Sequence, residues 1–194
     1  MRLLQDLSKT KHTYLYLQTM DNSLAIVYLA ILLVLLSSAG FTIFRQIFKT
    51  RRIENALSRL QKKLNKEKGT TQEYYELASI YLDKKVYAQA ISLFQKALKA
   101  AEQEAEENIA PIYNGLGYAY FAQEQYDLAI RNYKEALKYQ PQYLTALNNL
   151  AHAYERKSLT TQALQTYEQA LEVEPNNSTA KRRSEKLRRR LVTS

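Results

Sequence analysis

Residues 73–99 read EYYELASIYLDKKVYAQAISLFQKALK, and related stretches follow at residues 111–141, PIYNGLGYAYFAQEQYDLAIRNYKEALKYQP, and 146–175, ALNNLAHAYERKSLTTQALQTYEQALEVEP. Within each stretch, large apolar residues recur at spacings of three and four, which is typical of helices with one buried face. Units aligned on these residues begin at Thr71, Ala110 and Leu144, at intervals of 39 and 34 residues. A period of this length predicts stacked helix pairs that share one continuous core.

Small and large residues occupy fixed positions in these units. The eighth position is small in each unit and the eleventh is always tyrosine: Ala78, Gly117 and Ala151, then Tyr81, Tyr120 and Tyr154. Small residues let the two helices of a unit approach closely, while large residues fill the space between neighbouring units. The pattern resembles the tetratricopeptide repeat. That resemblance implies an all-α solenoid of three helix pairs, over residues 71–104, 110–143 and 144–177.

A five-residue insertion separates the first unit from the second, and it lies in an acidic run made of Glu102, Glu104, Glu106 and Glu107. We expect the second helix of the first unit to be longer than its equivalents. We interpret the glutamates as a solvated helix surface, in preference to a metal or partner site.

An uncharged segment precedes the repeats. Residues 22–44, NSLAIVYLAILLVLLSSAGFTIF, contain no charged side chain, and a helix of this length reaches about 34 Å, enough to cross a bilayer. A cleaved signal peptide has a shorter apolar region followed by a small-residue cleavage site, so we predict a retained transmembrane helix. Residues 1–21 are then an N-terminal extension. Translation from Met20 is an alternative that the intact mass of the native protein would test.

The charges around this segment predict its orientation. Within 20 residues of it, three basic side chains lie on the N-terminal side and seven on the C-terminal side. Basic residues are enriched on the cytoplasmic side of membrane helices. The C-terminal body is therefore predicted to lie in the cytoplasm or in its plastid equivalent.

Residues 45–70 join the predicted membrane helix to the first repeat and carry nine basic and two acidic side chains. Apolar residues recur there at spacings of four, three and four, which predicts a basic amphipathic linker helix. Gly69 is expected to end this helix, and Thr70 and Glu73 to form a capping box for the next one.

A second basic segment, residues 178–194, follows Pro175. It places Ala180, Ser184, Leu187 and Leu191 on one helix face, with Ser178 able to cap the helix. We predict a C-terminal capping helix whose polar outer face keeps the end of the solenoid soluble.

Two interpretations remain for the basic residues of these two segments. The linker helix either packs against the first repeat or contacts anionic lipid headgroups, and the terminal helix either caps the solenoid or contacts an acidic partner. The residues assigned to lipid or acidic-partner contact are Arg51, Arg52, Lys62, Lys63, Arg182, Arg183, Arg188 and Arg189.

The composition argues against several classes of function. The chain has no cysteine, two histidines and four glycines, so it has no thiol nucleophile and few candidate metal ligands or phosphate-binding loops. Its net charge of +9 comes from the two ends, because residues 71–177 carry 9 basic and 14 acidic side chains. A nucleic-acid surface would continue across the body. We therefore predict no catalytic residues, no metal, no cofactor and no nucleic-acid partner.

Tetratricopeptide-like solenoids receive partner segments on the concave face formed by the first helix of each pair. Exposed aromatic side chains are typical interface anchors, and Tyr118 and Phe121 are the expected anchors here, with Asn114 and Asn148 bonding the partner backbone. The predicted groove comprises Tyr75, Ser79, Leu82, Asn114, Tyr118, Phe121, Thr145, Asn148, His152 and Arg156.

The combination of anchor, basic linker, three repeats and the tail EPNNSTAKRRSEKLRRR resembles the membrane-anchored, three-repeat photosystem I assembly factors of cyanobacteria and some plastids. This resemblance implies a thylakoid protein, with repeats on the cytoplasmic or stromal side, that binds photosystem I subunits or assembly intermediates without doing chemistry. The alternatives are an anchored chaperone adaptor or a precursor-protein receptor. The sequence argues against the adaptor, because the basic clamp for a C-terminal carboxylate is missing. The oligomeric state stays open.

Overall fold

The computed structural model describes the backbone of residues 2–193 and the side chains of residues 27–192. Every regular element in this described part is a helix, so the all-α prediction is confirmed. The helices are α1 (Arg2–Leu64), α2 (Thr71–Asp83), α3 (Tyr87–Glu104), α4 (Ala110–Ala122), α5 (Tyr126–Tyr139), α6 (Leu144–Arg156), α7 (Thr160–Val173) and α8 (Ser178–Thr193). The chain divides into two compact units, one up to Glu54 and the other from Asn55 onward.

The first unit consists of the greater part of α1. From Val27 onward, α1 contains an 18-residue window of mean hydropathy 2.3, none of which is buried. By length and composition it is the one helix in the described part of the chain that can cross a membrane. The predicted extension at residues 1–21 lies outside the residues whose side chains are described, and the alternative start at Met20 stays a prediction.

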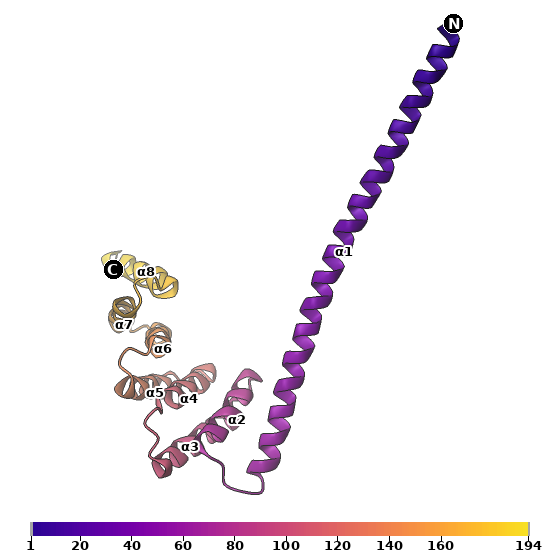
Figure 1. Ribbon diagram of the computed structural model, residues 1–194. Coiled ribbons are helices and arrows are strands. Elements are labelled where there is room, and N and C mark those ends of the chain that lie inside the picture. Colours follow the sequence, from indigo (N-terminus) through magenta and orange to yellow (C-terminus); the bar gives the residue numbers. More distant parts are fainter. Residues whose placement is uncertain (1, 194) are drawn as a thin grey trace. The chain divides into compact units, whose positions relative to one another are not determined.

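The second unit is a solenoid of helix pairs. Helix α2 packs against α3, α4 against α5 and α6 against α7, and α8 packs against α7. Figure 1 shows the successive pairs stacked beside one another, from α2 to α8. This is the predicted arrangement of three pairs and a terminal helix, and the predicted solenoid fold is confirmed.

The core of the solenoid follows the repeat pattern. The largest side chains with less than 2% exposure include one aromatic ring from the second helix of each pair: Phe94, Tyr133 and Tyr167. Burial raises the pKa of the Tyr133 and Tyr167 hydroxyls well above the ordinary value. Two of these rings, those of Phe94 and Tyr133, lie against glycines of α4. A Cβ added to Gly117 would lie 2.7 Å from the Tyr133 ring, and one added to Gly115 would lie 2.5 Å from the Phe94 ring.

The turns inside the three pairs share one unusual backbone conformation. Lys85, Glu124 and Ser158 have φ values of 60°, 61° and 59°, and each is the fifteenth residue of its unit. None of them is glycine. A fourth residue with positive φ, Ala105 at 51°, ends α3.

Helix α3 is 18 residues long, whereas α5 and α7 are 14. The longer second helix expected for the first repeat is therefore confirmed. It carries the acidic residues up to Glu104, and the remaining residues of the insertion lead to α4.

The helix ends agree with the sequence in part, and the linker helix ends at Leu64 and not at Gly69 as expected. The capping box of Thr70 and Glu73 is present at the start of α2. The cap predicted at Ser178 is wrong, because Ser178 is the first residue of α8 and the Ala180 backbone N–H donates instead to Asn177 Oδ1, at 2.9 Å. Asparagine accepts this bond as well as serine does. Further along α8, Leu191 is 42% exposed, although its spacing placed it on the same helix face as Leu187, which is buried.

Candidate functional site

A hollow of about 460 Å³ is formed by the first helices of all three repeats. Helices α2, α4 and α6 each contribute to its lining because they occupy the same place in successive pairs. It brings together six of the ten residues predicted for the groove: Tyr75, Ser79, Leu82, Asn114, Tyr118 and Thr145. It also includes residues that sequence reasoning did not assign to the groove, among them Asn149 and Lys85.

Aromatic rings line one side of the hollow, and one of them packs against a buried core ring. The Tyr75 ring lies 5.9 Å from the Phe94 ring, centroid to centroid, and Phe94 is completely buried. Tyr118 is 46% exposed. A large apolar side chain that is half-exposed beside a hollow is typical of an interface anchor.

Amide groups lie on the same wall. Asn149 Nδ2 donates to Asn114 Oδ1 over 3.0 Å, which joins α6 to α4. Asn114 thus has one amide atom engaged inside the protein. Asn148 does not line the hollow, and its Oδ1 is buried without a hydrogen-bond partner among the described residues.

The other predicted groove residues form a separate cluster. The Phe121 ring lies 4.9 Å from the His152 ring and 5.3 Å from the Tyr126 ring, while the Arg156 guanidinium lies over Tyr126 at 5.1 Å. Burial lowers the pKa of His152, and the positive charge of Arg183 lowers it further. Phe121 was expected to be a second anchor, but the structure places it in this cluster and outside the hollow.

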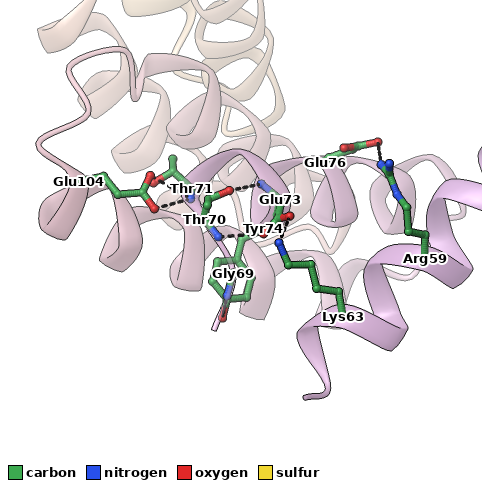
Figure 2. A network of polar contacts seen from close by, with 9 residues as sticks. All are labelled: Arg59, Lys63, Gly69, Thr70, Thr71, Glu73, Tyr74, Glu76 and Glu104. Carbon is green, nitrogen blue, oxygen red and sulfur yellow. Dashed lines mark hydrogen bonds and ion pairs between the residues drawn. The ribbon is translucent and has the colours of Figure 1, made fainter. Parts of the chain in front are cut away.

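The end of α1 packs onto the first repeat. Leu60 is only 2% exposed, and Gln61 Nε2 donates to the Tyr81 hydroxyl over 2.7 Å. Lys63 Nζ lies 2.5 Å from Glu73 Oε1, and Arg59 approaches Glu76 at 3.9 Å. Figure 2 shows both ion pairs between the last turns of α1 and the start of α2.

Lys63 therefore forms an ion pair within the protein. Of the two interpretations of the linker, the last turns of α1 agree with packing against the first repeat. The hydrogen bond from Lys63 lowers the pKa of Glu73 and in turn raises the pKa of Lys63. Lys62 is exposed on the same helix, and Arg51 and Arg52 are exposed in the first unit.

Two basic side chains of α8 form ion pairs with other helices of the protein. Arg183 lies 3.2 Å from both carboxylate oxygens of Glu155, which also accepts a 2.7 Å hydrogen bond from the Tyr167 hydroxyl. Arg188 lies 2.7 Å from Glu168. These contacts fasten α8 to the third repeat. Arg182 and Arg189 are exposed.

Comparison with known proteins agrees with this architecture. Two family models described as tetratricopeptide repeat match residues 70–142 and 114–181. The chain is 43% identical over 131 residues to the protein named uncharacterized protein ycf37 of Cyanophora paradoxa, covering 67% of this chain and 75% of that protein. It is 31% identical over 127 residues to tetratricopeptide repeat domain-containing protein PYG7, chloroplastic, of Arabidopsis thaliana, covering 66% of this chain and 42% of that protein.

Among solved structures, the first tetratricopeptide domain of Spaghetti (RPAP3), bound to the HSP90 peptide SRMEEVD, matches with a TM-score of 0.59 and 21% identity. The match covers 65% of this chain and 96% of that chain. At this identity the likeness shows the fold alone.

Proposed function

Because the chain belongs to the ycf37 family of tetratricopeptide-repeat proteins, we propose that it is a membrane-anchored scaffold that assists the assembly or stability of photosystem I. The resemblance noted in the sequence is confirmed by these relatives. The chain is a protein-interaction scaffold and not an enzyme. Its partners in this proposal are photosystem I subunits or assembly intermediates.

One observation carries the proposal of groove binding: the hollow of about 460 Å³ that draws its walls from three repeats and exposes Tyr118. A hollow shared by three helix pairs can hold an extended segment along the solenoid, so that each repeat adds contacts. The half-exposed ring of Tyr118 gives such a segment an apolar surface to bury. A partner subunit would thus be held by one of its segments while its own fold forms or docks.

Thylakoid location is part of the same proposal. It is supported by the apolar part of α1, by a chloroplastic relative and by the excess of basic residues on the C-terminal side of that segment. The repeats would then face the cytoplasm or stroma. Protease added to sealed thylakoids from the stromal side should remove a C-terminal tag, whereas a protected tag would reverse the topology.

The test of the function compares three full-length chains with a C-terminal tag, purified from gently solubilised thylakoids: the native chain, Tyr118→Ala and Tyr139→Ala. Tyr139 is a matched control, since it is 53% exposed on α5 and lies outside the hollow. We expect photosystem I subunits with the native chain and with Tyr139→Ala, and a clear loss with Tyr118→Ala. Equal recovery with all three chains would remove the hollow from the mechanism.

The same experiment separates the alternative, an anchored chaperone adaptor or precursor receptor. Five positions would carry the clamp for a C-terminal carboxylate in an adaptor, and here they line the hollow without a basic side chain: Tyr75, Ser79, Gly115, Thr145 and Asn149. The missing basic side chains at these five positions favour a segment over a free carboxylate, and Lys85, which also lines the hollow, is not one of the clamp positions. Recovery of chaperones, or of unrelated precursors, in place of photosystem I subunits would favour the alternative.

A further inference from the structure

A second hollow, of about 360 Å³, adjoins the first. The two share Tyr75 and Pro111 in their linings, so a segment that leaves the first hollow past these residues enters the second. The second hollow lies between the start of α2 and the insertion that follows α3. The insertion therefore adds a wall that the repeat pattern alone does not supply.

The chemistry of this second hollow is acidic. Glu104 and Glu106 both line it, and none of its lining residues is basic. Glu104 is fixed in place because the Thr71 backbone N–H lies 3.2 Å from each of its carboxylate oxygens, as Figure 2 shows. Glu106 accepts a 3.0 Å hydrogen bond from the Asn108 backbone. Both carboxylates are exposed, and neither forms an ion pair with a described residue.

The lining of the second hollow also includes a buried hydroxyl that has no hydrogen-bond partner in the described part of the chain. Thr71 is only 6% exposed and lines the hollow, and its Oγ1 has no hydrogen-bond partner among the described residues. A buried hydroxyl without a partner is costly in a protein on its own. Because Thr71 lines the hollow, a donor or acceptor that binds there and reaches Oγ1 would satisfy it.

These observations point to a partner of defined charge. Resting on the proposed function, we propose that the bound segment carries lysine or arginine at one end, placed between Glu104 and Glu106, while its apolar part lies against Tyr75 and Tyr118. A cation there meets two carboxylates that form no ion pair with a described residue, although Glu104 also borders a separate hollow lined by Lys68, Lys96 and Lys99. The insertion after the first repeat thus determines which segments bind and in which direction they lie.

The test selects binders from a random peptide library displayed on phage, using the full-length chain in detergent micelles. Two double variants with the same net charge are compared with the native chain: Glu104→Gln with Glu106→Gln, and Glu102→Gln with Glu107→Gln. The second pair is a matched control, because both of its residues belong to the same acidic run but lie outside the hollow. Glutamine keeps the acceptor oxygen that each carboxylate gives to the backbone, and circular dichroism checks that the helices are retained.

We expect selected peptides to have lysine or arginine grouped at one end of an apolar stretch. A selected peptide, labelled with a fluorophore, should bind the Glu104→Gln, Glu106→Gln chain about tenfold more weakly than the native chain, with a smaller dependence on salt. It should bind the control chain with nearly native affinity. Acidic or neutral selected peptides, or equal losses in both double variants, would overturn the proposal.

The outcomes separate this proposal from the proposed function. Peptides whose binding is lost with Tyr118→Ala but is unaffected by Glu104→Gln with Glu106→Gln would leave the groove in place and reject the basic segment. Binding that is unaffected by Tyr118→Ala would reject groove recognition itself.

Discussion

Replacing Gly117 by alanine measures how tightly the two helices of the second repeat pack. An added Cβ would lie 2.7 Å from both Cδ1 and Cε1 of Tyr133, and 3.2 Å from its Cγ. Carbon atoms prefer separations of about 3.5–4.0 Å, so the ring would have to retreat by about 1 Å. Tyr133 is only 1% exposed and packs in the same apolar cluster as Leu147 and Leu150. The ring therefore has little room to move.

The expected cost follows from two opposing effects. Overpacking a filled core destabilises a protein by about 1–3 kcal/mol, while replacing glycine by alanine inside a helix stabilises it by about 1 kcal/mol. The difference is a net loss of up to about 2 kcal/mol, and we expect the upper part of this range because the Tyr133 ring is almost completely buried.

Urea unfolding of the full chain in detergent micelles, followed by far-ultraviolet circular dichroism, measures this change. Gly40→Ala is the matched control, since a Cβ there meets nothing within 4 Å and only the helix preference for alanine acts, so its midpoint should equal or slightly exceed that of the native chain. An unchanged or raised midpoint for Gly117→Ala would refute the reasoning, since it would mean that the Tyr133 ring yields at little cost.

Three further predictions concern the ends of the solenoid. Leu60→Ala should lower the free energy of unfolding by about 2–4 kcal/mol, because Leu60 is 2% exposed; a native urea midpoint would contradict packing of α1 on the first repeat. Glu73 has its pKa lowered from 4.5 by the hydrogen bond from Lys63, so its stabilising effect is complete above pH 4.5 and is lost as the pH falls through the lowered value. Unfolding midpoints measured against pH should therefore fall less steeply in acid for Glu73→Gln, and parallel curves would exclude the pair as a cause. Asn177→Ala removes the acceptor of the Ala180 N–H and should cost about 1 kcal/mol, seen as faster hydrogen exchange in the first turn of α8 with other helices unaffected.

Much of the fold was predictable because the repeat pattern is local and redundant. Each unit shows the same pattern of small and large residues. Ala78, Gly117 and Ala151 therefore each predict the same close contact between the two helices of a pair. The cap of α8 was less predictable, because Asn177 and Ser178 are adjacent and either can accept the bond. Only the backbone path of the turn decides between them, and that path depends on how α8 packs against α7.

The candidate site was predictable where it depends on position along one helix and not where it depends on neighbours. Tyr75 and Tyr118 line the hollow as the spacing indicated. Phe121 occupies an equally suitable position by spacing, but Tyr126 and His152 from other helices pack against it. The ion pair of Arg183 was likewise not predictable, because its partner Glu155 lies 28 positions earlier in the chain. No pattern in the sequence marks such pairs.

The three left-handed turns have a consequence for how the solenoid unfolds. A side chain held at positive φ costs roughly 1–2 kcal/mol relative to glycine, and this strain recurs at the same place in every pair, at Lys85, Glu124 and Ser158. In a linear array, each repeat opens with its own free energy and is coupled only to its neighbours. Ser158→Gly, outside the first hollow, would thus relieve the third repeat alone and reveal whether the array begins to open at that end. Glu124→Gly would relieve the second repeat but would also remove the 3.8 Å ion pair of Glu124 with Arg156 of the third.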